Sequence, residues 1–123
     1  MVKRPTPPGL RLRYVFADGT MLGPGKAELL EAIRETGSIA GAGRRMGMSY
    51  KRAWLLVETL NAGFREPLVA SSRGGAGHGG AQLTATGEEV LALYRRLEVR
   101  SREAAAAEIL RLEALARDMV TGK

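Results

Sequence analysis

The chain has 123 residues, enough for one compact hydrophobic core or for one small core and a long helix. It contains no cysteine, which excludes disulfides and thiolate metal sites and is compatible with a reducing compartment. The formal net charge of +6 is common among proteins that bind nucleic acids. There is no run of about eighteen apolar residues, and the basic N-terminus lacks the apolar core of a signal peptide. We therefore expect a cytoplasmic protein, associated with the nucleoid and not with a membrane.

The excess positive charge is confined to two segments. Residues 1–23 carry four cations and one anion, and residues 37–63 carry the same numbers. The rest of the chain holds eleven cations and eleven anions. Because a surface that faces DNA phosphates needs concentrated cations, these two segments are the candidates for such a surface.

The N-terminal part is predicted to be an arm, a short β-structure and a helix. Residues 1–9 hold three of the five prolines and two cations, so we expect a flexible basic arm. Residues 10–16 alternate between apolar and other side chains, the pattern of a half-buried strand, and Asp18-Gly19 indicates a turn. Residues 24–36 begin with a proline, have apolar residues on one side and stop at Gly37, which predicts a helix.

Residues 37–63 predict two helices joined by a tight turn. Ser38 is a suitable N-cap for a helix to about residue 46, in which small residues allow a neighbour to come close. Gly47 marks the turn, and Ser49 caps a second helix to about residue 62, with Gly63 as its stop. In a helix-turn-helix of this layout, one helix braces the second, which enters the major groove of double-stranded DNA.

The second of these helices has two different sides. Its expected core side, with the only tryptophan as an anchor, consists of Tyr50, Trp54, Val57 and Leu60. The opposite side consists of Lys51, Arg52, Leu55 and Thr59. Arginine pairs well with guanine, and free amides at a helix start favour a phosphate. A surface helix with solvated cations is the alternative; the capped helix before it, the turn and the confined charge favour DNA binding.

A glycine-rich segment follows. Residues 68–72 and 81–84 suit two short strands, and residues 73–80 between them contain five glycines. We expect a wing, in which backbone amides approach the sugar-phosphate closely and Arg73 supplies charge. A disordered loop without a partner is the alternative. A phosphate-binding loop is excluded because no Gly-Lys-Ser/Thr follows the glycines. His78 is the single histidine, so we expect no metal site there, and either a solvent-exposed side chain or one that contacts phosphate in the complex.

The C-terminal part is predicted to be one long helix over residues 85–119, followed by a tail of residues 120–123. One apolar stripe consists of Val90, Leu93, Leu97 and Ala104, and a second consists of Ile109, Leu112, Ala116 and Met119. The stripes are offset around residues 101–107, where we expect a bend or a change of packing partner. A small core cannot cover so long a stripe, so we expect it to form a homodimer interface.

The expected fold is mainly α with a small β component: a winged helix-turn-helix over residues 10–84 and a long C-terminal dimerisation helix. The expected function is sequence-specific binding of double-stranded DNA in transcription regulation. No catalytic group of side chains or cofactor site is present, so we expect no enzyme and no cofactor. The predicted DNA contacts are Ser38, Arg44, Arg45, Ser49, Tyr50, Lys51, Arg52, Thr59, Arg73, Gly75, Gly77 and His78.

Residues 37–87 resemble the N-terminal DNA-binding domain of the ModE family of molybdate-responsive transcriptional regulators, a winged helix-turn-helix related to that of LysR-type regulators. With the upstream strand and helix, the resemblance covers about residues 10–100. It is carried by Gly37-Ser38-Ile39, Gly47-Met48-Ser49-Tyr50-Lys51, Ala53-Trp54, the wing from Arg73 to Gly80, and Leu83-Thr84 with Gly87.

The resemblance implies that Ser49, Tyr50, Lys51 and Arg52 stand at the start of the recognition helix, with the wing beside them. It also implies homodimers built largely through helices of this domain, which would bind an inverted repeat. Full-length members of that family carry a C-terminal pair of small β-barrel domains that bind molybdate. This sequence ends at Lys123, so molybdate sensing by the chain stays open.

Two other functions are compatible with the same residues. The long helix would pair with a separate sensor chain if the protein were an interaction module. Alternatively, Ser38, Lys51 or wing amides would capture a small oxyanion such as molybdate or tungstate.

Overall fold

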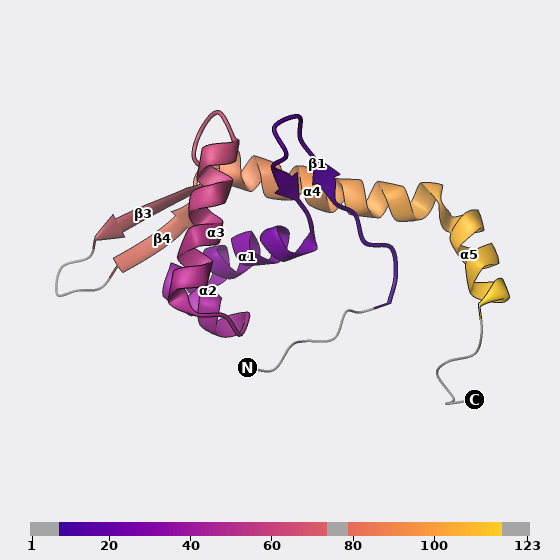
Figure 1. Cartoon of the computed structure of the whole chain (residues 1–123), viewed down its shortest axis with the longest axis horizontal. Helices are drawn as coiled ribbons and strands as arrows, with labels where there is room; N and C mark the ends of the chain where they lie inside the picture. Colours follow the sequence, from indigo (N-terminus) through magenta and orange to yellow (C-terminus); the bar gives the residue numbers. More distant parts are fainter. Residues whose placement is uncertain (1–7, 74–78, 117–123) are drawn as a thin grey trace.

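A computed structural model describes residues 8–73 and 79–116 of the chain. Helices α1 to α3 form one body with a β-hairpin at its side, and α4 runs along this body and beyond it to α5 (Figure 1). The mainly α fold with a small β component is confirmed. The elements are β1 (Tyr14–Val15), β2 (Met21–Leu22), α1 (Pro24–Thr36), α2 (Ile39–Arg45), α3 (Tyr50–Gly63), β3 (Val69–Arg73), β4 (Gly79–Leu83), α4 (Ala85–Ala104) and α5 (Ala106–Leu115).

Local signals in the sequence fix the ends of the first three helices. Pro24 begins α1, and Gly37, at a φ of 77°, ends it in the left-handed conformation that glycine adopts readily. The Ser38 hydroxyl accepts a hydrogen bond from the Gly41 amide at 2.8 Å, and the Ser49 hydroxyl accepts one from the Arg52 amide at 3.1 Å. Both serines are therefore N-caps, as the sequence predicts.

Close approach explains why α2 carries glycines inside a helix. A Cβ at Gly43 would lie 3.2 Å from the Met48 carbonyl oxygen and 3.3 Å from the Ala53 Cβ. Gly47, at a φ of 70°, turns the chain between α2 and α3. The two helices of the helix-turn-helix thus pack with their backbones near each other, which fixes the orientation of α3.

The hydrophobic core lies between α1, α3, the base of the β3–β4 hairpin and the first half of α4. Its largest fully buried side chains are Leu29, Leu30, Ile33, Leu60, Leu68 and Tyr94. The hairpin is held to the helices by backbone as well: the Ala81 amide donates to the Gly37 carbonyl at 2.9 Å. This core positions α3 and the hairpin together.

The predicted N-terminal strand is shorter than expected. Only Tyr14–Val15 pairs with Met21–Leu22, and the Tyr14 side chain is exposed. Phe16 packs against the core, with its ring 5.5 Å from that of Phe64 in an edge-to-face arrangement, and Leu10 and Leu12 are also half-buried. The pairing extends no further toward residue 10 because β2 ends at Leu22, with only Gly23 before α1 begins.

The C-terminal helix is broken and not continuous. Thr84 caps α4 by accepting a hydrogen bond from the Gly87 amide at 3.0 Å, and α4 ends at Ala104, with Ala105 as its C-cap. Helix α5 then leaves in a different direction (Figure 1) and ends at Leu115. The prediction of one helix over residues 85–119 is therefore wrong. The bend expected within residues 101–107 is confirmed. No helix in the described ranges is long and apolar enough to span a membrane.

Candidate nucleic-acid interface

The cations at the start of α3 are available for an external partner. Lys51 and Arg52 are exposed, and no salt bridge joins either of them to another described residue. The amide of Arg52 is occupied by the Ser49 cap. The first turn of α3 therefore presents two unpaired cations beside the positive end of its dipole, which suits phosphates and base edges.

The predicted core face of α3 is wrong at its two aromatic residues. The buried residues of this helix are Ala53, Val57 and Leu60. Tyr50 is 57% exposed and Trp54 is 41% exposed, so the tryptophan does not anchor the core. On the helix both aromatic residues lie at one edge of the buried stripe, and that edge faces the β3–β4 hairpin.

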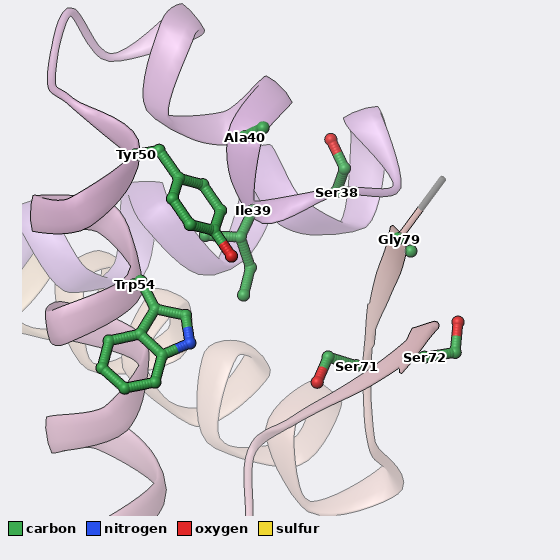
Figure 2. A pocket seen from close by; sticks show the side chains of 9 residues that line it. Ser38, Ile39, Ala40, Tyr50, Trp54, Ser71, Ser72 and Gly79 are labelled. Atoms are coloured by element: carbon green, nitrogen blue, oxygen red, sulfur yellow. The ribbon is translucent and has the colours of Figure 1, made fainter. Parts of the chain in front are cut away.

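A groove of about 550 Å³ separates α3 from this hairpin. Figure 2 shows the Tyr50 hydroxyl and the Trp54 indole nitrogen pointing from α3 toward the groove, and the Ser71 hydroxyl pointing toward it from β3. The residues that line the groove are Ser38, Ile39, Ala40, Tyr50, Trp54, Ser71, Ser72, Gly79 and Gly80, none of which carries a charge.

The wing, β3 and β4 with their connection, is anchored at its base, where β3 begins and β4 ends. In its antiparallel register Val69 lies opposite Leu83 and Arg73 lies opposite Gly79. The observed ends of β3 differ by one residue from the predicted ends, and those of β4 differ by one or two residues. The Asn61 amide group accepts hydrogen bonds from the amides of Leu68 and Val69 and donates one to the Val69 carbonyl, at 2.9 to 3.1 Å. One side chain of α3 thus holds the wing beside that helix.

The other predicted DNA contacts fall into three groups. Arg44 and Arg45 are exposed at the end of α2, where Arg45 forms a salt bridge with Glu35. The hydroxyl of Thr59 is exposed but donates to the Leu55 carbonyl of its own helix at 3.0 Å. The predictions for Gly75, Gly77 and His78 lie outside the described residues.

An ion-pair network that the sequence did not reveal fixes α4 on α1. Arg95 donates to both carboxylate oxygens of Glu31, at 2.7 and 2.9 Å, and to the buried Glu98 at 2.8 Å. The hydrogen bond from Arg95 lowers the pKa of the Glu31 carboxyl, and its carboxylate partners raise the pKa of Arg95. Arg95 and Glu31 are 64 residues apart, so no local pattern could have paired them.

The predicted dimerisation residues are mostly uncovered. Leu93 is 45% exposed, Leu97 is 50% exposed and Leu112 is 66% exposed. Ala104 and Ala116 are also exposed, Val90 and Ile109 are half-buried, and Met119 lies outside the described ranges. Leu93, Leu97 and Leu112 are therefore uncovered in the described part of the chain, whereas Val90 packs against the hydrophobic core.

Comparison with known proteins identifies the family. Residues 25–88 match the family described as bacterial regulatory helix-turn-helix protein, lysR family. The chain belongs to this family. The match covers α1, the helix-turn-helix, the wing and the start of α4, which are the elements that build the groove and the unpaired cations.

Curated relatives are similar to this lysR-family chain over about two thirds of its length. The molybdenum transport protein ModE of Azotobacter vinelandii is 44% identical over 81 residues, which are 66% of this chain and 30% of that protein. The transcriptional regulator ModE of Yersinia pestis is 41% identical over 80 residues, which are 65% of this chain and 28% of that protein. The aligned region thus spans less than a third of the length of either relative.

A solved structure agrees with this assignment. The CbnR_DBD chain in its crystal structure with DNA has a TM-score of 0.54 and 28% identity. The alignment covers 76% of this chain and 97% of that chain. The winged helix-turn-helix expected from the sequence is therefore confirmed, and the resemblance to ModE regulators is confirmed over this domain.

Proposed function

We propose that this lysR-family chain binds specific sequences of double-stranded DNA as part of a transcriptional regulator. The observation that carries the proposal is the first turn of α3, where Ser49 caps the helix and Lys51 and Arg52 are exposed and unpaired. The fixed wing beside it gives the surface two elements that fit neighbouring grooves of one duplex. In this proposal the protein is a DNA-binding protein and not an enzyme, and it acts in the cytoplasm, at the nucleoid.

The cations divide into two roles. Lys51 and Arg52, in the first turn of α3, would contact base edges and the nearest phosphates. Arg44, in the last turn of α2, and Arg73, the last residue of β3, would contact the DNA backbone. Base contacts carry sequence information, whereas backbone contacts add affinity for every sequence.

Two substitutions test this division. Arg52→Ala is expected to relax sequence preference, because it removes a side chain that reads base edges. Arg73→Ala is expected to weaken binding to all sequences and to reduce the slope of log affinity against log salt by about 1. Fluorescence anisotropy with operator and random duplexes at several salt concentrations measures both. Equal losses on operator and random DNA for both variants would contradict the division.

Two copies of the chain would form the DNA-binding unit. The exposed leucines of α4, Leu93 and Leu97, support this proposal, and the hydrogen bonds of Arg95 to Glu31 join this helix to α1. A dimer around a two-fold axis would present two recognition helices about 34 Å apart, to an inverted repeat.

Replacing Leu97 with Glu tests the dimer, because two carboxylates would enter an apolar contact. We expect the variant to be a monomer in analytical ultracentrifugation and to bind a single half-site as well as the unchanged protein does. A dimer that survives the change, or an unchanged protein that is monomeric at micromolar concentration, would argue instead for a separate partner chain on α4.

A further inference from the structure

Three uncharged hydrogen-bond donors converge on the groove between α3 and the wing. The Tyr50 hydroxyl and the Trp54 indole nitrogen come from α3, and the Ser71 hydroxyl comes from β3 (Figure 2). None of these three groups donates to another described residue. They are therefore free to bind acceptor atoms of an external partner.

The position of the groove selects that partner. In the proposed complex α3 lies in the major groove and the wing lies over the neighbouring minor groove. A sugar-phosphate strand separates these two grooves of a duplex, so this strand must pass between α3 and the wing. The space of about 550 Å³ that the structure shows at this point contains the three donors and two apolar surfaces, Ile39 and the indole ring.

We infer that this groove holds one phosphodiester and its deoxyribose. Trp54, Tyr50 and Ser71 would donate hydrogen bonds to the phosphate oxygens, and the indole ring would pack against the sugar. The inference rests on the proposed DNA binding and names residues that hold the backbone without charge. Such contacts fix the register of α3 on the duplex.

Uncharged donors have a measurable signature. A cation that neutralises a phosphate releases a counterion, so its loss makes the affinity less dependent on salt. A hydroxyl or an indole N–H releases none. Removing one of these donors is therefore expected to weaken binding by roughly tenfold, the usual effect of a lost hydrogen bond to a charged group, with the salt slope unchanged.

Two variants and a matched control test the inference on operator DNA. Trp54→Phe keeps a ring and removes the N–H, and Ser71→Ala removes only a hydroxyl. Tyr14→Phe is the control, because it removes one hydroxyl from an exposed side chain of β1, which does not line the groove. We expect roughly tenfold weaker binding for the first two variants at every salt concentration from about 50 to 200 mM, and no change for the control.

A duplex with one methylphosphonate identifies the phosphate. When the methylphosphonate is at the position held by the groove, the losses of binding free energy from it and from Ser71→Ala should not be additive. At other positions of the methylphosphonate the two losses should be additive. Since Trp54 is the only tryptophan, acrylamide quenching of its fluorescence should fall when the operator binds. Circular dichroism of each variant confirms that the fold is retained.

The outcomes separate the two proposals. An unchanged protein that binds no duplex would overturn the proposed function itself. Three results would overturn only the groove contact. They are unchanged DNA affinity of Trp54→Phe and Ser71→Ala, additive effects of Ser71→Ala and the methylphosphonate at every position, and a smaller salt dependence of the affinity in these variants. Saturable binding of inorganic phosphate or molybdate at micromolar concentration would mark a site for free oxyanions and would also overturn it.

Discussion

Replacing Gly87 with alanine should destabilise the fold, because α4 begins in contact with the backbone that leads into the wing. A Cβ at Gly87 would lie 2.1 Å from the carbonyl oxygen of Leu68 and 3.0 Å from its carbonyl carbon. The added methyl group belongs to the rigid start of α4 and the atoms that it meets are backbone atoms of Leu68, so no side-chain rotation relieves the clash. The start of α4 and the strand base would have to separate by roughly 1 Å.

This separation acts on two hydrogen bonds. The same Leu68 oxygen accepts from the Thr84 amide at 2.9 Å, and the Thr84 hydroxyl donates to the Pro67 carbonyl at 2.7 Å. Each is worth about 1 kcal/mol net, and overpacking adds a similar amount, while alanine in a helix returns less than about 1 kcal/mol. We expect Gly87→Ala to lower the free energy of unfolding by about 2 kcal/mol, which lowers the melting temperature by roughly 10 °C.

Thermal and urea unfolding followed by circular dichroism measure the change. Gly25→Ala is the matched control, because it adds the same methyl group in the first turn of α1, where no atom lies within 4 Å. The control should unfold at or slightly above the midpoint of the unchanged protein. If Gly87→Ala were as stable as the control, the close packing of α4 on the wing base would be refuted.

Two further changes test how the wing and α4 are held. Asn61→Ala should lower the free energy of unfolding by about 2 kcal/mol or more in urea, because it leaves the amides of Leu68 and Val69 without their acceptor; an effect below about 0.5 kcal/mol would contradict the anchoring. Glu31→Gln tests the pairing with Arg95 through pH. Arg95 lowers the pKa of Glu31 in the folded state, so the pair stabilises the fold above the ordinary pKa near 4.5, and this contribution disappears as the pH falls through the lowered value. The unchanged protein should therefore be more stable than the variant at pH 7, and the difference should vanish in acid; a difference that is constant with pH would argue against the ion pair.

Local chemistry made the helix-turn-helix predictable. Ser38 and Ser49 are caps whose partners lie three residues away, and Gly37 and Gly47 adopt conformations that favour glycine. Once Ser49 is identified as the N-cap, the sequence also shows that Lys51 and Arg52 lie in the first turn of α3. These features depend on residues near one another in the chain, so the sequence alone was sufficient.

Features that depend on distant contacts were missed. Trp54 lies at the edge of the buried stripe, and only the position of the wing decides that it borders a groove and not the core. The pairing of Arg95 with Glu31 joins two helices that are far apart in the sequence. The break at Ala105 falls in a run of four alanines, residues 104–107, which all favour helix, so propensity gives no sign of it.

Selection of bound sequences from a random duplex pool near physiological salt tests the central claim most directly. A dimer that reads DNA through α3 should enrich an inverted repeat whose half-sites are centred about 10 base pairs apart or a multiple of that, and Arg52→Ala should reduce the enrichment. The same selection with molybdate shows whether this oxyanion changes binding. Salt-sensitive binding to every duplex, with no sequence enriched, would contradict the account, because affinity would then come from phosphate contacts alone.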